Sequence, residues 1–284
     1  RALFAGAILA ARQGDSHGGA TLHEESRRIY ESLGDRRGIV VCLMALGNQY
    51  VGQGELAKAR AALERSLELW SELGIGAGYA RALSNLAFVA RGQRQFPEAR
   101  GLYRDAAERF SRLGDETSRA WSVNHEGDVA REQGELDAAE ALYREALSAF
   151  ETLGHRWGVA SSRADLALVA RLRGDPLTAG RLYREALAIF VALDHRRGIA
   201  RLLESLACLA AEQGQATRAF RLAASADVMR ERMGAPPSPA ERADLARSLA
   251  TLRLAAGASA TRGAWQDGGA LSTDEAVRLA LGDD

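Results

Sequence analysis

Apolar residues recur along this chain at spacings of three and four, which is the period of one face of an α-helix. The clearest runs are Ala80, Leu83, Leu86, Ala87 and Ala90, followed by Leu102, Ala106, Phe110 and Leu113. No stretch of the sequence shows the sustained alternation of apolar and polar residues that indicates a half-buried β-strand. The pattern therefore predicts an all-α protein.

Turn-forming residues divide the expected helices at a fixed interval of 40 residues. One set follows the second helix of each pair and consists of Gly34, Gly74, Gly114, Gly154, Asp194 and Gly234. The other set lies between the two helices of a pair and consists of Gly14, Gly54, Arg94, Gly134, Gly174 and Gly214. Two breaks in each period indicate two helices, and self-similarity at this spacing is typical of a solenoid whose units bury their apolar faces against their neighbours.

Equivalent positions of the repeat keep a constant residue size. Small residues occupy one position of the first helix (Gly47, Ala87, Gly127, Ala167, Ala207) and one of the second helix (Ala59, Ala99, Ala139, Ala179, Ala219). Four residues after the second set come Leu63, Tyr103, Tyr143, Tyr183 and Ala223. Large residues above small ones predict a closely packed helical hairpin. Glu126 and Arg163 interrupt apolar positions, so the third and fourth units are expected to be less tightly packed or polar at their edge.

At these positions the chain resembles the tetratricopeptide repeat family. Leu43-x2-Leu46-Gly47-x2-Tyr50, followed by Ala59-x3-Leu63, is similar to the family signature. Weaker copies are Leu83/Leu86/Ala87 with Ala99/Tyr103, Val123/Gly127 with Ala139/Tyr143, Leu166/Ala167 with Ala179/Tyr183, and Leu203/Leu206/Ala207 with Ala219. The resemblance implies a right-handed superhelical solenoid of antiparallel helix pairs over residues 1–234, in about six units of which the first is incomplete. Its long period resembles the extended repeats of kinesin light chains and large bacterial regulators.

The 40-residue spacing stops at the proline cluster of residues 235–238. Ser238 and Glu241 form a capping-box pattern that predicts a capping helix from about residue 239 to 256, with Leu245, Leu249 and Leu252 on its buried stripe. Residues 257–269 are small and polar and predict a flexible link, and residues 272–275 predict the start of a short final helix. Residues 235–284 would then form the capped end that a solenoid needs.

This last segment resembles the extreme C-terminus of large bacterial ATPase-type and LuxR-like regulators. The matching residues are Glu241-Arg242 to Leu252, Trp265-x2-Gly268-x2-Leu271, and Glu275-Ala276-Val277-x3-Ala280-Leu281. In such proteins a catalytic or signalling domain precedes the repeats, so the resemblance implies the sensor or scaffold end of a larger regulatory protein. Arg1 lies inside an expected helix that runs to about Gln13, which favours a piece of a longer chain.

The composition of the chain mainly excludes classes of function. The chain has 37 acidic and 37 basic residues, so no nucleic-acid footprint is expected. It has no run of 18 apolar residues and no signal peptide, and we expect a cytoplasmic protein. Cys42 and Cys208 are expected to be buried thiols, and His155 and His195 lack a third ligand position for a metal. We therefore expect no cofactor, no metal and no enzymatic activity, so that any catalysis would belong to an upstream domain.

The remaining candidate is a surface. The resemblance implies that first helices line the concave side of the solenoid. The predicted partner-binding residues are Asn48, Arg81, Phe88, Arg91, Trp121, Asn124, Asp128, Arg131, Leu168, Arg171 and Arg201. A ladder of Arg91, Arg131 and Arg171 beside aromatic residues would suit an extended peptide with acidic groups. Alternatively, Trp121 belongs to the core and the arginines pair with Asp128 and Glu132.

Two functions follow from this surface. The first is a protein-protein interaction scaffold that binds a peptide or protein partner on its concave face. The second is a regulatory sensor that binds a small ligand or peptide and controls an attached catalytic or transcription-regulating domain. An open groove would favour the scaffold, and a deep pocket with converging polar groups would favour the sensor. End repeats could also pair between two copies of the chain.

Overall fold

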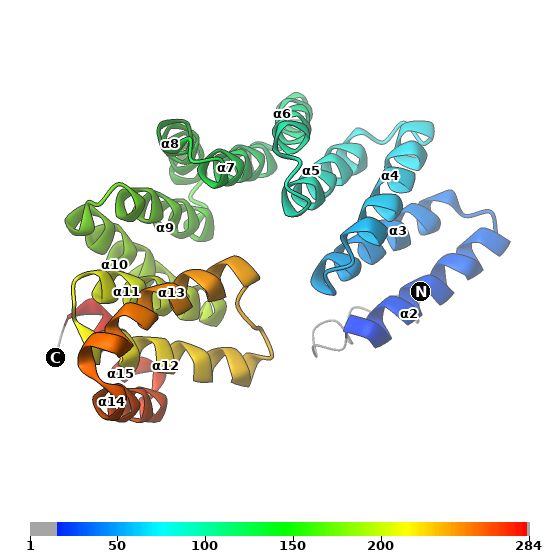
Figure 1. The fold of residues 1–284 in the computed structure, drawn as a ribbon. Helices are drawn as coiled ribbons and strands as arrows, with labels where there is room; N and C mark the ends of the chain where they lie inside the picture. Colours follow the sequence, from blue (N-terminus) through cyan, green and yellow to red (C-terminus); the bar gives the residue numbers. More distant parts are fainter. Residues whose placement is uncertain (1–15, 283–284) are drawn as a thin grey trace. The chain divides into compact units, whose positions relative to one another are not determined.

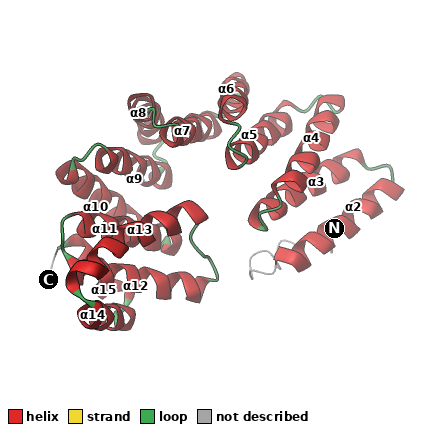
Figure 2. Ribbon diagram, viewed as in Figure 1, coloured by secondary structure: helices red, strands yellow, loops and turns green. Residues whose placement is uncertain are grey.

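The computed structural model describes residues 16–282, and its regular secondary structure is helical throughout (Figures 1 and 2). The described helices are α2 (Ser16–Ser32), α3 (Arg36–Gly52), α4 (Leu56–Glu72), α5 (Gly76–Gly92), α6 (Phe96–Arg112), α7 (Glu116–Glu132), α8 (Leu136–Thr152), α9 (Arg156–Leu172), α10 (Pro176–Ala192), α11 (Arg196–Glu212), α12 (Ala216–Met233), α13 (Pro239–Ala256), α14 (Ala258–Ala270) and α15 (Thr273–Leu281). None of them is long and apolar enough to cross a membrane. The helix expected to end near Gln13 lies outside the described residues.

The chain forms two compact units, Arg1–Ala149 and Phe150–Asp284. In the first unit, successive helices from α2 to α7 pack on one another, and first helices of neighbouring pairs also touch, α3 on α5 and α5 on α7. In the second unit, α9 to α12 follow the same order, and α9 touches α11. This arrangement confirms the all-α repeat solenoid, while its predicted handedness stays a prediction.

The turns follow the predicted 40-residue spacing. Arg94 and Asp194, which replace glycine in the two sets, have φ values of 61° and 47° and so adopt the same left-handed backbone as their glycine equivalents. His155 and His195 occupy N-cap positions, where each Nδ1 accepts a hydrogen bond of 3.0 Å from a backbone N–H, of Gly158 and of Gly198. Aspartates cap other helices in this way, so the paired histidines have a capping role.

Large side chains seated on glycine fix the spacing of the helices. A Cβ added at Gly47 would lie 2.7 Å from Leu63, and one added at Gly127 would lie 2.8 Å from Tyr143, so these two helix pairs leave no room for a methyl group at this position. A second set of contacts joins consecutive pairs and was not predicted. It seats Tyr30, Trp70, Phe150 and Phe190 on Gly38, Gly78, Gly158 and Gly198, with added Cβ atoms at 2.3–2.7 Å.

The two polar residues in apolar positions are ion-paired. Glu126 is 5% exposed, and its carboxylate accepts a 2.7 Å hydrogen bond from Arg104 and lies 3.6 Å from Arg100. Arg163 pairs with Glu151 at 3.0 Å and with Glu185 at 3.7 Å. Buried charge is tolerated when it is paired, which explains how both residues fit in the repeat.

The C-terminal segment contains one correction to the predicted order. α13 and α15 begin with the predicted capping boxes, but the flexible link expected at residues 257–269 is wrong, because α14 spans most of it. Small residues allow this helix to lie directly on α12: a Cβ at Gly268 would meet the backbone of Arg221 at 2.3 Å. Ser225 donates a 2.8 Å hydrogen bond to the Gly268 carbonyl, and Trp265 packs on Phe220. The segment belongs to the second compact unit, so residue 234 ends the repeats without ending the packed unit.

A matched pair of alanine substitutions tests the packing of large residues on glycine. Gly127→Ala should lower the free energy of unfolding by about 1–3 kcal/mol, because the methyl group displaces Tyr143. Gly101→Ala, at an open helical position, should raise it by about 0.5–1 kcal/mol. Urea titration followed by circular dichroism measures both, and an unchanged or raised stability in Gly127→Ala would contradict the packing account.

Candidate partner-binding surface

The first-helix face of the first unit is partly open and partly engaged in internal contacts. Asn48 and Arg81 are exposed, and Phe88 is 41% exposed although it is a large apolar residue. Trp121 is half-buried and stacks on His125 with ring centroids 5.7 Å apart. Asn124 is only 2% exposed, so it does not belong to the surface on which it was predicted. We call Arg81, Phe88, Arg91, Trp121, Asp128 and Arg131 the α5–α7 surface.

Asp128 is the centre of the polar contacts on this surface. Its carboxylate accepts hydrogen bonds from Arg91 at 2.6 Å and from the Tyr143 hydroxyl at 2.9 Å. Nδ1 of His125 lies 3.4 Å away. Burial opposes ionisation of Asp128, but the neighbouring His125, Arg91 and Arg131 outweigh it and hold its pKa well below the ordinary value. The carboxylate is therefore ionised at neutral pH and fixes the groups around it.

The ladder arginines of this unit are paired within the chain. Arg91 contacts Asp128 at 2.6 Å and Glu132 at 3.5 Å, and Arg131 lies 3.8 Å from each of the two carboxylates. The guanidinium carbon of Arg91 also lies 5.1 Å from the centroid of the Phe88 ring. Of the two arrangements considered for these arginines, the paired one is present, and it orders a cation above an exposed aromatic ring.

The equivalent face of the second unit is covered by α13. Arg171, with a side chain 5% exposed, donates to Glu212 at 2.8 Å and to Asp244 of α13. Arg201 donates to Asp165 at 2.6 Å and lies 3.7 Å from Glu241 of α13. Leu168 is half-buried and packs against the core. Arg171 and Arg201 were predicted to bind a partner, but residues of α13 already contact both arginines.

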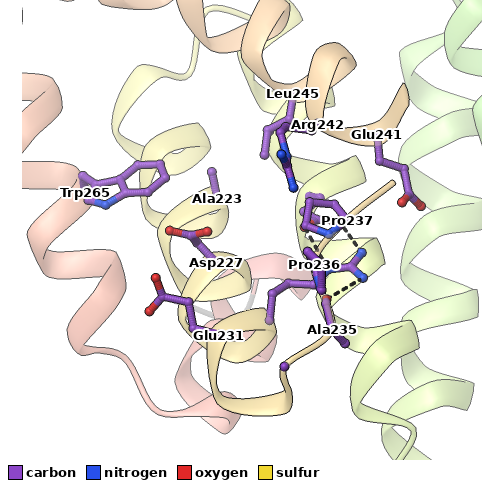
Figure 3. Close-up of a pocket in the computed structure, with 13 residues that line it drawn as sticks. Ala223, Asp227, Glu231, Ala235, Pro236, Pro237, Glu241, Arg242, Leu245 and Trp265 are labelled. Carbon is purple, nitrogen blue, oxygen red and sulfur yellow. Dashed lines mark hydrogen bonds and ion pairs between the residues drawn. The ribbon is translucent and has the colours of Figure 1, made fainter. Parts of the chain in front are cut away.

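A cavity of about 430 Å³ lies between α12, α13, α14 and the turn at residues 234–237 (Figure 3). Trp265 comes from α14, Asp227 and Glu231 come from α12, and Arg242 and Leu245 come from α13. The buried Arg230 forms part of the lining, where it donates to the carboxylate of Glu204 at 2.7 and 3.1 Å. No sequence pattern predicted this cavity, because its α14 wall was expected to be a flexible link.

Among the described residues, the thiols and acidic side chains form no metal centre. Cys42 and Cys208 are both buried and unpaired, and burial raises the pKa of the Cys208 thiol to about 11. Within residues 16–282, no group of three His, Cys, Asp or Glu side chains is placed to hold a metal ion. The prediction that the chain uses no cofactor stays a prediction.

Neutralising Asp128 should show how strongly it organises the α5–α7 surface. Asp128→Asn should lower the free energy of unfolding at pH 7 by about 2–3 kcal/mol, because Arg91 keeps a desolvated charge without its main partner. The folded pKa lies below the unfolded value of about 3.9, so this contribution is present above about pH 4 and is lost as the pH falls further.

Urea titrations at pH 7 and about pH 3 should therefore show a smaller difference between the wild type and Asp128→Asn at the lower pH. Glu108→Gln removes an exposed ion pair with Arg112 and serves as the control, with an expected change below about 0.5 kcal/mol. Equal effects of the two substitutions would contradict the organising role of Asp128.

Solved structures with the same architecture include two Rap proteins and a signal-transduction ATPase. The apo form of RapI matches 98% of this chain and 97% of its own length, with a TM-score of 0.67 and 16% identity. A Signal Transduction ATPase with Numerous Domains from Pyrococcus horikoshii, with a tetratricopeptide repeat sensor, matches 94% of this chain but only 41% of its own length, with a TM-score of 0.64 and 16% identity. A Rap protein complexed with Competence and Sporulation Factor matches 70% of this chain and 60% of its own length, with a TM-score of 0.54 and 17% identity. These identities support a common fold alone.

The family comparison is more local. No curated protein matches the sequence significantly. The model of the tetratricopeptide repeat matches residues 78–152, which contain α6 to α8 and all of α5 except its first two residues. The same pairing of helices, with the same turn spacing, continues before and after this segment. Residues 78–152 therefore match the tetratricopeptide repeat family, and they lie within a longer array of helix pairs built in the same way.

Proposed function

We propose that this chain is a non-catalytic protein-interaction module that binds a protein or peptide partner on the α5–α7 surface. The observation that carries the proposal is the ordered pair of Phe88 and Arg91, in which the aromatic ring is 41% exposed and the guanidinium is fixed by Asp128. Aromatic residues and arginine are enriched among the residues that dominate binding energy at interfaces. Arg81 lies about two helical turns before Phe88 on the same face of α5.

The internal ion pairs support binding by holding the surface in one arrangement before a partner arrives. Association costs conformational entropy for each long side chain that it immobilises, and Arg91 is already held by two carboxylates. Its charge is largely satisfied, so acidic groups of a partner would find exposed Arg81 more readily than Arg91. We propose a partner with an apolar anchor for Phe88 and an acidic group for Arg81.

The comparisons support a regulatory setting for this module. One similar structure is a Rap protein complexed with Competence and Sporulation Factor, and another belongs to a signal-transduction ATPase with a repeat sensor. Together with the resemblance of the C-terminal segment, they favour the scaffold end of a larger bacterial regulatory protein that acts in the cytoplasm. Pairing of two copies through end repeats stays a prediction.

Selection of binding peptides tests the proposed surface without a known partner. Peptides from a random display library should bind the full chain, and Phe88→Glu should weaken their binding by at least about tenfold, because it removes an aromatic anchor and repels acidic groups. Leu177→Glu is the matched control, since Leu177 is 82% exposed but lies on a second helix. Fluorescence anisotropy measures both variants. Binding that Phe88→Glu leaves unchanged would place the partner elsewhere and defeat the proposal.

The cavity beside α13 favours a second candidate function, that of a ligand sensor. Its volume of about 430 Å³ lies within the usual range for small-molecule sites, and it combines Trp265 and Leu245 with charged groups. A ligand there would contact α12, α13 and α14 together, so its binding would stabilise the packing of the C-terminal helices on the last repeat. This function would coexist with partner binding on the α5–α7 surface.

Thermal shift with a metabolite library tests the sensor function. A ligand at a hundred times its dissociation constant should stabilise the chain by about 2.7 kcal/mol. Ala substitutions at Arg242 and Glu231, both exposed residues of the cavity, should reduce that shift with little effect on the unliganded protein. A shift that persists in both variants would mean that the ligand binds at another site.

A further inference from the structure

The position of α13 shows how this solenoid fills one of its own first-helix faces. α13, orange in Figure 1, packs on α11, and two of its residues reach the arginines predicted to bind a partner. Arg201 and Cys208 lie on the predicted lining positions of α11, which correspond by the 40-residue period to Arg81 and Phe88 of α5. The chain therefore places a helix on the same face that the α5–α7 surface leaves open.

The ion pairs explain why the two faces differ. Arg91 and Arg171 are equivalent residues, and each contacts a glutamate 41 residues later, Glu132 and Glu212 respectively. In the first unit the second carboxylate comes from Asp128, within the repeats. The equivalent residue in the second unit is Cys208, which carries no negative charge because its pKa is raised. The second carboxylate for Arg171 comes from Asp244 of α13.

The face under α13 therefore favours an occupant that adds a second carboxylate for Arg171. The Arg171 side chain is 5% exposed, and a buried charge is costly unless oppositely charged groups accompany it. Asp244 supplies such a group, and Glu241, three residues earlier and so about one turn away on the same side of α13, lies beside Arg201. Leu249 and Leu252, 6% and 7% exposed, continue this side of the helix into the core. An acidic pair followed by leucines is thus the pattern that the face accepts.

The attachment of α13 allows its replacement. It follows a turn that contains Pro236 and Pro237, which ends α12 and gives α13 an N-terminus of its own. Its outer side is open to solvent, with Arg247 at 78% and Leu254 at 89% exposure. The fit to the face is also incomplete, because Nε of Arg171 is buried and has no hydrogen-bond partner among the described residues. A helix from another protein that supplies this acceptor would satisfy the face better than α13 does.

We propose that the face of α9 and α11 is a second interaction site, that its partner is an amphipathic helix with two acidic residues one turn apart followed by leucines, and that α13 occupies the site until such a helix displaces it. This inference rests on the proposed function, since it assumes that first-helix faces bind partners. It adds a separate site and the chemistry of its occupant.

A labelled synthetic peptide that copies residues 237–254 tests the proposal on the full chain by fluorescence anisotropy. The peptide should bind weakly to the wild type, where α13 competes. It should bind at least about tenfold, or ~1.4 kcal/mol, more tightly to Glu241→Gln/Asp244→Asn, which weakens the hold of α13 but keeps the face intact. Adding Arg201→Gln to that variant should abolish the gain. A peptide with the same two residues neutralised is the matched control and should bind at least about tenfold more weakly to every variant.

Hydrogen exchange on the wild type keeps the proposal testable if the double variant does not fold. Excess acidic peptide should accelerate exchange of the amides of α13 and leave those of α10 unchanged, because the peptide releases only the displaced helix. Equal affinity for the wild type and the double variant, equal binding of the neutralised peptide, or unchanged exchange in α13 would each overturn the proposal.

The variants also separate this inference from the proposed function. Phe88→Glu alters only the α5–α7 surface, so it should leave binding of the α13 peptide to the double variant unchanged. If Phe88→Glu abolishes that binding and Arg201→Gln does not, the peptide uses the α5–α7 surface. That result would overturn the second site and support the first. The second site would also be overturned, and the first supported, if library peptides lose affinity in Phe88→Glu and the α13 peptide binds to none of the variants.

Discussion

The architecture depends on large side chains seated against backbone that lacks a Cβ atom. Within a pair, Leu63 lies on Gly47 and Tyr143 on Gly127, and between pairs Phe150 lies on Gly158 and Phe190 on Gly198. Each contact brings two helices close enough to bury the large side chain almost completely, since Leu63, Tyr143, Phe150 and Phe190 are at most 2% exposed. Because one contact acts within a pair and the other between pairs, together they propagate the same geometry along the repeat.

This packing uses the other faces of the first helices and does not require the face on which Arg91 and Arg171 lie. The ion pairs of these two arginines determine whether that face is open or covered. In the first unit, Asp128 neutralises Arg91 from inside the repeats, so the face needs no carboxylate from another segment and stays partly open. In the second unit, Cys208 stands at the equivalent position and Arg171 takes its carboxylate from Asp244. The two faces thus differ at one equivalent position of the repeat. Aspartate there accompanies an open face, and cysteine there accompanies a face covered by α13.

The sequence predicted those features that depend on local chemistry. Turn residues set the helix pairs, and Ser238 and Ser272 marked the starts of α13 and α15, because capping and left-handed turns are fixed by neighbouring residues. The small and polar composition of residues 257–269 led to a wrong prediction of a flexible link. These residues form α14 because the helix packs closely on α12, and this packing outweighs their weak local preference for a helix.

The candidate site was predicted less fully than the fold. The period placed Phe88 and Arg91 on one face, but it could not show that Asn124 is buried or that α13 covers Arg171 and Arg201. The first depends on how far each helix is rotated into the core. The second depends on where a segment about 40 to 70 residues later folds back, which no repeat pattern encodes.

The central functional claim is that first-helix faces, and not the second helices, receive partners. Hydrogen exchange of the full chain with and without a saturating library-selected peptide tests it most directly, because it maps contact helix by helix without any substitution. We expect new protection confined to first helices, chiefly α5 and α7. Protection of α4, α6 and α8 instead, with α5 and α7 unchanged, would contradict it.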